Sequence, residues 1–371
     1  GQGKKKSAKK YGGGMASMTI GTPKLRRKTL STFTRQLATL LEAGLPLVRA
    51  LRTLERQTKN VPEKRVICET ADGVEGGKTF SDALALNPKS FNKLYINMVK
   101  AGEASGDLEQ VLARLAEYME KAARLRAKVK SALIYPVVVL FIALSITTLL
   151  LVFIVPKFKK MFEDMLGGDE LPKLTQVVIG ISNIVKERAL WAVLVLILFV
   201  VAFILFKRTK VGSYIMDYVA IKLPPFGGLV TKSTVARFCS TLGTLMQSGV
   251  SVLNALVIVR DTSGNEVVAR AVQVVHDAVK EGEAMAKPLE ESKIFPMMVI
   301  SMIEVGEETG ALPEMLGRVA TVYEEEVDMA VEGLTSLIEP VMIVFLGVLV
   351  GGIVLAMFMP LIKLIDTMSS M

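Results

Sequence analysis

The sequence predicts an all-α membrane protein: two homologous helical-bundle domains in the cytoplasm, related by an internal repeat, and three transmembrane helices. Three observations support this fold class. Hydrophobic residues make up 51% of the 371 residues, and the mean hydropathy of +0.44 is high for a soluble protein. Three long apolar segments interrupt the chain. The stretches that precede the first and third of them repeat the same phrases, so each copy is predicted to be one folded unit.

The net charge of +9 lies at the N-terminal end. Nine of the 45 Lys and Arg residues are within residues 1–28, which contain no acid, and the remaining basic residues balance the 36 acidic ones. This segment is rich in Gly, Ser and Lys, so residues 1–30 are predicted to be a flexible basic tail. Two interpretations of this tail stay open. It is either a solvated linker, part of which is left over from protein expression, or a segment that contacts anionic lipid headgroups. A neutral body does not indicate a nucleic-acid partner.

Three segments have the length and apolarity of membrane spans. The first, "LIYPVVVLFIALSITTLLLVFIV", has no charge over 23 residues, and each segment can cross roughly 30 Å of hydrocarbon as a helix. The predicted organisation is a first domain at 31–132, spans at 133–156, 189–206 and 337–360, a periplasmic loop at 157–188, a second domain at 207–336 and a periplasmic tail at 361–371.

The flanking charges predict the orientation. Basic residues concentrate just before the first span and just after the second, and positive residues favour the cytoplasm; they are Lys121, Arg124, Arg126, Lys128, Lys130, Lys207, Arg208 and Lys210. Both flanks are therefore predicted to face inward. Two crossings return the chain to the same side, so both domains are expected to be cytoplasmic.

The repeat is visible in matched phrases. "FTRQLATLLEAGLPLVRAL" (33–51) aligns with "FCSTLGTLMQSGVSVLNAL" (238–256), 205 residues later. Farther on the offset is 204: Phe91 matches Phe295, and Pro156 matches Pro360. Each copy is thus a domain of about 100 residues followed by a membrane helix.

The apolar pattern within each copy is helical. Leucines recur at intervals of three, four and seven residues after Phe33, and "EAGLP" interrupts them with Gly44 and Pro46. That interruption predicts a corner between two helices. No run alternates apolar and polar residues as a strand would, so we expect two compact helical bundles.

One phrase, GE-x-x-G-x-L, occurs twice. Its members are Gly102, Glu103 and Gly106 in the first copy and Gly306, Glu307 and Gly310 in the second. The glycines are predicted to close one helix and permit tight approach to the next. The recurring glutamate has three possible roles: a buried or helix-capping acid, a partner-docking acid, or a metal-touching acid.

Small residues follow helical spacing on the third span. Gly347 and Gly351 are four residues apart, and Gly352 and Ala356 repeat that spacing on the adjoining face. Such patterns let membrane helices pack closely. The alternative is glycine that faces lipid.

The sequence lacks the residue patterns that the common classes of enzyme require. The single histidine, His276, has no Cys or His neighbour in the sequence, and no G-x-x-x-x-G-K-[ST] phosphate-binding loop is present. Cys68 and Cys239 lie outside any motif and are expected to be reduced. We predict a protein that is not an enzyme, with no catalytic, cofactor or metal residues.

The stretch "KVKSALIYPVVVLFIALSITTLLLVFIVP" (128–156) resembles the signature of the type II secretion F / type IV pilus assembly platform family. "FTRQLATLLEAGLPL", "YINMVKAGEASGDL" and "VGEETGALPEML" are also similar to phrases of the family, so the resemblance covers residues 33–366. Its signature positions at the starts and ends of the spans are Lys128, Tyr135, Pro136 and Pro156 in the first copy and Glu339 and Pro340 in the second.

The resemblance implies an inner-membrane platform protein of a bacterial type IV pilus or type II secretion pseudopilus machine, dimeric or of higher order. Its implied partners are a hexameric assembly ATPase, pilin or pseudopilin subunits, other inner-membrane assembly proteins and the lipid bilayer. Some secretion-type relatives hold calcium near the first GE phrase, but Arg49 stands where an acid is wanted, and Ala311 replaces Asp107 in the second copy.

A second class of function stays open: a small membrane transporter or channel with cytoplasmic regulatory domains. Such a protein needs polar groups along an intramembrane path. The spans offer few, and most lie near their ends: Tyr135, Ser145, Thr147, Thr148 and Glu339.

Overall fold

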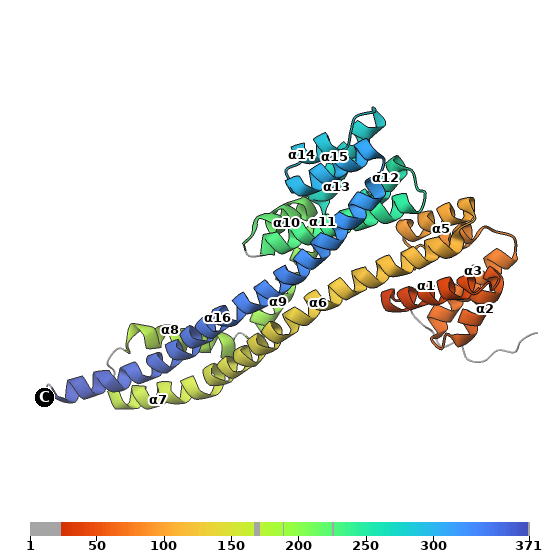
Figure 1. Cartoon of the computed structure of the whole chain (residues 1–371). Helices are drawn as coiled ribbons and strands as arrows, with labels where there is room; N and C mark the ends of the chain where they lie inside the picture. Colours follow the sequence, from red (N-terminus) through yellow and green to blue (C-terminus); the bar gives the residue numbers. More distant parts are fainter. Residues whose placement is uncertain (1–23, 167–170, 188, 225, 370–371) are drawn as a thin grey trace, which may run out of the picture.

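The computed structural model describes residues 24–166, 171–187, 189–224 and 226–369, and every regular element within these ranges is a helix. Two long helices, α6 (Leu108–Leu149) and α16 (Leu312–Ser369), run alongside each other, with helical bundles at one end and α7 and α8 at the other (Figure 1). The predicted all-α class and the internal repeat are confirmed for these residues.

The first bundle is built from short helices that pack against the start of α6. A left-handed glycine, Gly44 (φ +80°), follows the first of them, as predicted for the corner at "EAGLP". Asn60, Thr79 and Asn92 cap three of the others by accepting backbone N–H bonds. The helices are α1 (Arg27–Glu42), α2 (Leu47–Gln57), α3 (Val61–Glu75), α4 (Phe80–Ala85) and α5 (Lys93–Ser105).

The first domain begins earlier than predicted. Leu25 is 1% exposed within the core, and its N–H donates to Ser90 Oγ at 3.0 Å. The Thr29 hydroxyl donates to Glu63 on α3 at 3.0 Å. These long-range contacts order residues 24–30, which were predicted to belong to the basic tail; residues 1–23 of that tail lie outside the described residues.

The second bundle repeats the first. In each copy a tilted aromatic pair joins the first helix of the repeat to the segment before the fifth: Phe33 and Phe91 have ring centroids 6.5 Å apart, and Phe238 and Phe295 4.8 Å. The repeated helices are α11 (Phe226–Gln247), α12 (Val252–Thr262), α13 (Glu266–Lys280), α14 (Ala286–Glu291), α15 (Met297–Thr309) and the start of α16; α10 (Lys210–Lys222) precedes them.

Two of the predicted spans belong to helices that rise out of the bundles without a break. The apolar windows in Leu108–Phe162 and Leu312–Ile362 are long enough to cross a membrane, and only 11% of each window is buried. A third apolar helix, α9 (Ala189–Arg208), leaves Trp191 and Phe199 65% and 67% exposed.

The segments between and after the spans differ from the prediction. The segment 157–188 was predicted as a loop, but it contains most of α7 (Val155–Leu166) and all of α8 (Lys173–Glu187). The predicted C-terminal tail continues α16 through Pro360 as far as Ser369. Proline does not end these helices because nearby side chains can satisfy the backbone groups that it frees.

Candidate functional site

The duplicated glutamate caps a short helix in both copies. Both carboxylate oxygens of Glu103 accept N–H bonds at the start of α4, from Phe80 and, at 3.0 Å, from Ser81. Glu307 accepts from Met285 at 2.9 Å and from Ala286 at 3.4 Å, at the start of α14. A carboxylate at a helix N-terminus satisfies donors that the helix itself leaves free.

The glycines of the same phrase shape the corner around that cap. Gly106 (φ +82°) and Gly310 (φ +71°) end α5 and α15 in the left-handed conformation that glycine adopts without strain. A Cβ on Gly102 would lie 3.0 Å from Val111 Cβ, and one on Gly306 would lie 2.8 Å from Leu312 Cα. The phrase therefore builds a tightly packed helix corner.

This geometry matches the capping role, one of the three that the sequence left open. Partner docking by the two corners stays a prediction. Across the described ranges no group of three His, Cys, Asp or Glu side chains is placed to hold a metal ion.

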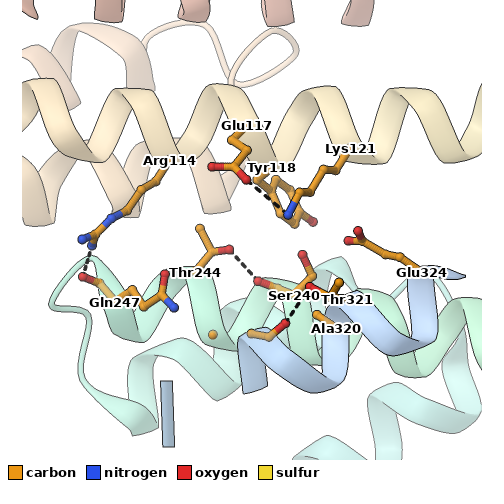
Figure 2. Close-up of a pocket in the computed structure, with 12 residues that line it drawn as sticks. Arg114, Glu117, Tyr118, Lys121, Ser240, Thr244, Gln247, Ala320, Thr321 and Glu324 are labelled. Carbon is orange, nitrogen blue, oxygen red and sulfur yellow. Dashed lines mark hydrogen bonds and ion pairs between the residues drawn. The ribbon is translucent and has the colours of Figure 1, made fainter. Parts of the chain in front are cut away.

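A polar interface joins the two domains where α6 faces α11 and α16 (Figure 2). Arg114 donates to the carbonyl of Gln247, and the Tyr118 hydroxyl lies 3.0 Å from that of Thr241. At one end of the interface Lys93 pairs with Asp261 at 2.7 Å. Each of these three contacts involves a charged or hydroxyl-bearing side chain of α6 or α5 that reaches across to the second bundle.

A cavity of about 150 Å³ lies within this interface. Lys121 and Glu117 of α6 form an ion pair at 3.2 Å on one wall, and Glu324 of α16 lies on the other (Figure 2). Burial raises the pKa of Glu324 above its usual value, while Lys121 and Arg124 partly oppose that rise. Polar groups thus surround a cavity in this interface, beside the apolar residues that both bundles contribute to one continuous core.

Sequence reasoning missed this interface. Each of its residues lies on a helix surface whose local pattern is that of an ordinary solvated face. Among the predicted signature residues, Lys128 joins the two copies at this interface. Its ammonium pairs with the Asp328 carboxylate of α16, and both residues lie just before the predicted spans of their helices.

The remaining signature residues are separate from this interface. Tyr135 is 58% exposed, Pro136 is partly exposed, and both lie within the unbroken helix α6. Glu339 and Pro340 lie exposed within α16.

Pro156 and Pro360, which match each other in the repeat, each leave one backbone carbonyl without its helical N–H donor. A hydroxyl of α8 donates a hydrogen bond to that carbonyl instead. A π-helical turn, η1 (Leu150–Ile154), precedes Pro156, and in it the Val155 N–H donates to Leu150 O. The next hydrogen bond of this pattern would run from the N–H of residue 156 to the Leu151 carbonyl, but Pro156 has no N–H. The Ser182 hydroxyl of α8 donates to the orphaned Leu151 carbonyl instead.

The second copy uses the same device. Pro360 cannot donate to the carbonyl of Ala356, four residues earlier. Thr175 of α8 donates its hydroxyl to that carbonyl at 2.5 Å, and both residues are buried. Thr175 and Ser182 are two helical turns apart, so one face of α8 bridges the two proline sites.

Of the small residues predicted to pack on the third span, Ala356 makes a close contact with another helix in the described part of the chain. Ala356 is fully buried beside α8. Among the residues that the structure describes, a Cβ on Gly347, Gly351 or Gly352 would meet no atom within 4 Å outside its own helix. Close packing at these three glycines therefore stays a prediction.

The match to a known protein family covers both copies of the repeat. The family "type II secretion system (T2SS), protein F" matches two segments, residues 33–156 and 238–360. The two segments coincide with the two copies, each ending at its proline.

Individual relatives cover nearly the whole chain. The type IV pilus assembly protein PilC of Thermus thermophilus is 44% identical over 343 residues, which are 92% of this chain and 84% of the relative. PilC of Myxococcus xanthus is 43% identical over 91% of this chain and 80% of the relative. The type II secretion system protein F of Xanthomonas campestris is 36% identical over 94% of this chain and 88% of the relative. The resemblance seen in the motifs is therefore confirmed, and the chain belongs to the type II secretion F / type IV pilus assembly platform family.

Proposed function

We propose that this protein is the inner-membrane platform of a type IV pilus machine, in which a cytoplasmic assembly ATPase drives pilin subunits from the bilayer into the fibre. Both domains are cytoplasmic in this proposal, and α6, α9 and α16 are the three spans. The relatives named for pilus assembly, at 44% and 43% identity, favour a pilus over a secretion pseudopilus, since the secretion relative reaches 36%.

One observation carries the mechanical part of the proposal. The helix α6 starts in the first bundle at Leu108 and continues through the apolar segment to Leu149, and α16 does the same from Leu312. A helix of 42 residues is a rod about 60 Å long. A force applied to a bundle is therefore transmitted to the membrane segment by a continuous helix.

The interface between the bundles supports relative movement. Polar contacts surround a cavity of about 150 Å³ within it. Polar interfaces within a chain can shift without the large loss of hydrophobic burial that opening a core would cause. An ATPase that turns one bundle against the other would thus rotate α6 relative to α16.

One of the polar residues of the first span does not support the transporter alternative. The Ser145 hydroxyl donates to Phe141 O of its own helix at 2.7 Å. This hydroxyl is therefore engaged within its helix rather than offered to a solute path.

The test uses the full-length protein in lipid nanodiscs. We expect it to retain the cognate assembly ATPase in a pull-down and to change the rate of ATP hydrolysis. Glu103→Ala and Glu307→Ala are a matched pair because each removes the same cap from one copy. Loss of binding in one variant alone would identify the docking domain; no binding by the wild type, together with solute uptake into liposomes, would favour the transporter.

A further inference from the structure

Helix α10 has an apolar face that nothing else in the described chain covers. It begins directly after α9, with Thr209 as the N-cap between them. The side chains on its outer face recur with helical spacing and are exposed: Val211 (66%), Ile215 (45%), Tyr218 (42%) and Val219 (48%). An exposed apolar stripe of this kind is atypical of a helix that faces water.

A second face of α10 contacts the second bundle. The Asp217 carboxylate accepts the N–H of Glu266 at 2.7 Å, at the start of α13. The Tyr214 ring holds the guanidinium of Arg270 at 4.2 Å from its centroid. The apolar stripe is therefore turned away from the domain by defined contacts.

The contacts between α11 and α16 show where α10 lies along the long helices, because α10 leads into the start of α11. Gln247 donates to Pro313 O at 3.3 Å, and Lys232 pairs with Glu326 at 3.1 Å, so the two helices are antiparallel. Extending that register places Phe226, the first residue of α11, level with about residues 332–334 of α16. That level is about one helical turn before Leu337, where the third apolar segment starts.

Both ends of α10 consequently lie near the level at which the spans begin. Its N-terminus follows the last residue of α9, and its C-terminus is joined to α11 by residues 223–225 alone. A helix fixed at both ends near one level runs along the membrane surface rather than away from it.

The charges near α10 complement an anionic surface. Lys207 and Arg208 are exposed at the end of α9, and at the other end Lys222 lies over the Tyr218 ring, 4.7 Å from its centroid. Basic side chains around an apolar stripe with an aromatic residue are typical of helices that lie in the headgroup region. Anionic lipids attract such clusters.

We propose that α10 is an interfacial helix that binds the cytoplasmic leaflet, with Val211, Ile215 and Val219 inserted among the lipid chains and Lys207, Arg208 and Lys222 at anionic headgroups. The inference rests on the membrane topology of the proposed function. It gives the second bundle an attachment to the bilayer surface that the described part of the first bundle lacks, because the first described residues of that copy lead straight into α1.

The experiment measures lipid contact in the full-length protein. Single cysteines at Ile215 and Val219, in a Cys68→Ser background, carry a nitroxide in vesicles containing phosphatidylglycerol. Collision rates with oxygen, which concentrates in lipid, are compared with those of a water-soluble nickel chelate. Val61→Cys is the matched control, because Val61 is 74% exposed on α3 of the first bundle. Phe199→Cys reports on α9.

We expect labels at positions 215, 219 and 199 to favour oxygen several-fold over nickel, and the label at 61 to favour nickel. Replacing phosphatidylglycerol with phosphatidylcholine should reduce the oxygen preference at 215 and 219 without changing that at 199. Nickel preference at 215 and 219 with oxygen preference at 199 would overturn the interfacial helix and leave the span intact. Nickel preference at 199 as well would overturn the topology itself. Protection from both reagents at 215 and 219 would assign the stripe to a protein partner.

Discussion

The two bundles keep one set of contacts in common and differ in another, and the difference follows their position in the molecule. Both retain the capping glutamate, the left-handed glycine and the aromatic pair. They differ along the seam between the first and last helices of the bundle, α1 with α6 in one copy and α11 with α16 in the other.

In the first copy this seam is closed by polar partners. Arg35 of α1 forms two hydrogen bonds to Glu120 of α6, at 2.8 and 2.9 Å. Beside this seam, the Thr34 hydroxyl of α1 lies 3.1 Å from the buried Tyr95 hydroxyl of α5. The contact with Arg35 lowers the pKa of Glu120.

The second copy replaces these partners. By the repeat offsets, Arg35 becomes Ser240, Glu120 becomes Glu324, Thr34 becomes Cys239 and Tyr95 becomes Val299. Ser240 and Glu324 line the cavity that faces the first domain, and the pKa of Glu324 is raised instead of lowered. Contacts that close a corner are thus shared by both copies, whereas the seam of the second copy has become part of the interface between the domains.

The largest of the effects predicted here is expected at the glycine corners, where the second copy has the closer contact. Gly306→Ala puts a methyl group 2.8 Å from a backbone atom, whereas Gly102→Ala meets Val111 Cβ at 3.0 Å. We expect Gly306→Ala to lower the free energy of unfolding by about 3 kcal/mol and Gly102→Ala by about 2 kcal/mol. Denaturant unfolding of each purified variant in detergent measures both. Equal losses would mean that the two corners are packed alike.

Removing a cap should have the next largest effect and should be local. Glu103→Ala leaves the N–H groups of Phe80 and Ser81 without their acceptor, which costs about 2 kcal/mol. Hydrogen exchange should accelerate across residues 79–85 in this variant and across 285–291 in Glu307→Ala. Unchanged exchange in either segment would show that the cap contributes nothing to that helix.

Breaking the bridge made by α8 should affect both copies to a similar extent. Thr175→Val and Ser182→Ala each leave a carbonyl orphaned by proline, and we expect each to cost about 1 kcal/mol in lipid. Thermal unfolding of the proteoliposome-reconstituted protein measures the loss. Pro360→Ala supplies the missing N–H, so it should make Thr175→Val nearly neutral; an unchanged cost in that background would contradict the orphaned-carbonyl account.

The smallest effect is a pH dependence of opposite sign in the two copies. Because the folded pKa of Glu120 is lowered, its pairing with Arg35 stabilises the protein at neutral pH and is lost as acidification protonates the carboxylate. For this half-exposed pair we expect Glu120→Gln to cost about 0.5 kcal/mol at pH 7.

The raised pKa of Glu324 means that its charged form is disfavoured in the folded state, so acidification relieves a penalty. Glu324→Gln should therefore be neutral or stabilising at pH 7. Unfolding midpoints of both variants from pH 4 to 8 check the signs, and a loss of stability in both at pH 7 would remove this distinction between the copies.

Local sequence determined the repeated units of this protein. Apolar spacing and helix-ending residues such as Gly44 and Gly106 act over a few neighbours, so the helices, their corners and the long apolar segments could be predicted from the chain alone. The same applies to the repeat, because a domain of this size folds as a unit wherever its pattern recurs.

Tertiary structure decided what joins those units. The capping of α4 by Glu103, the pairing of Lys93 with Asp261 and the bonds from α8 to the proline-freed carbonyls connect residues 22 to 181 positions apart. Prolines 156 and 360 could be matched in the sequence, but their hydroxyl partners could not. A hydroxyl on a helix carries no local mark of the carbonyl that it will reach, because only the packing of distant helices brings donor and acceptor together.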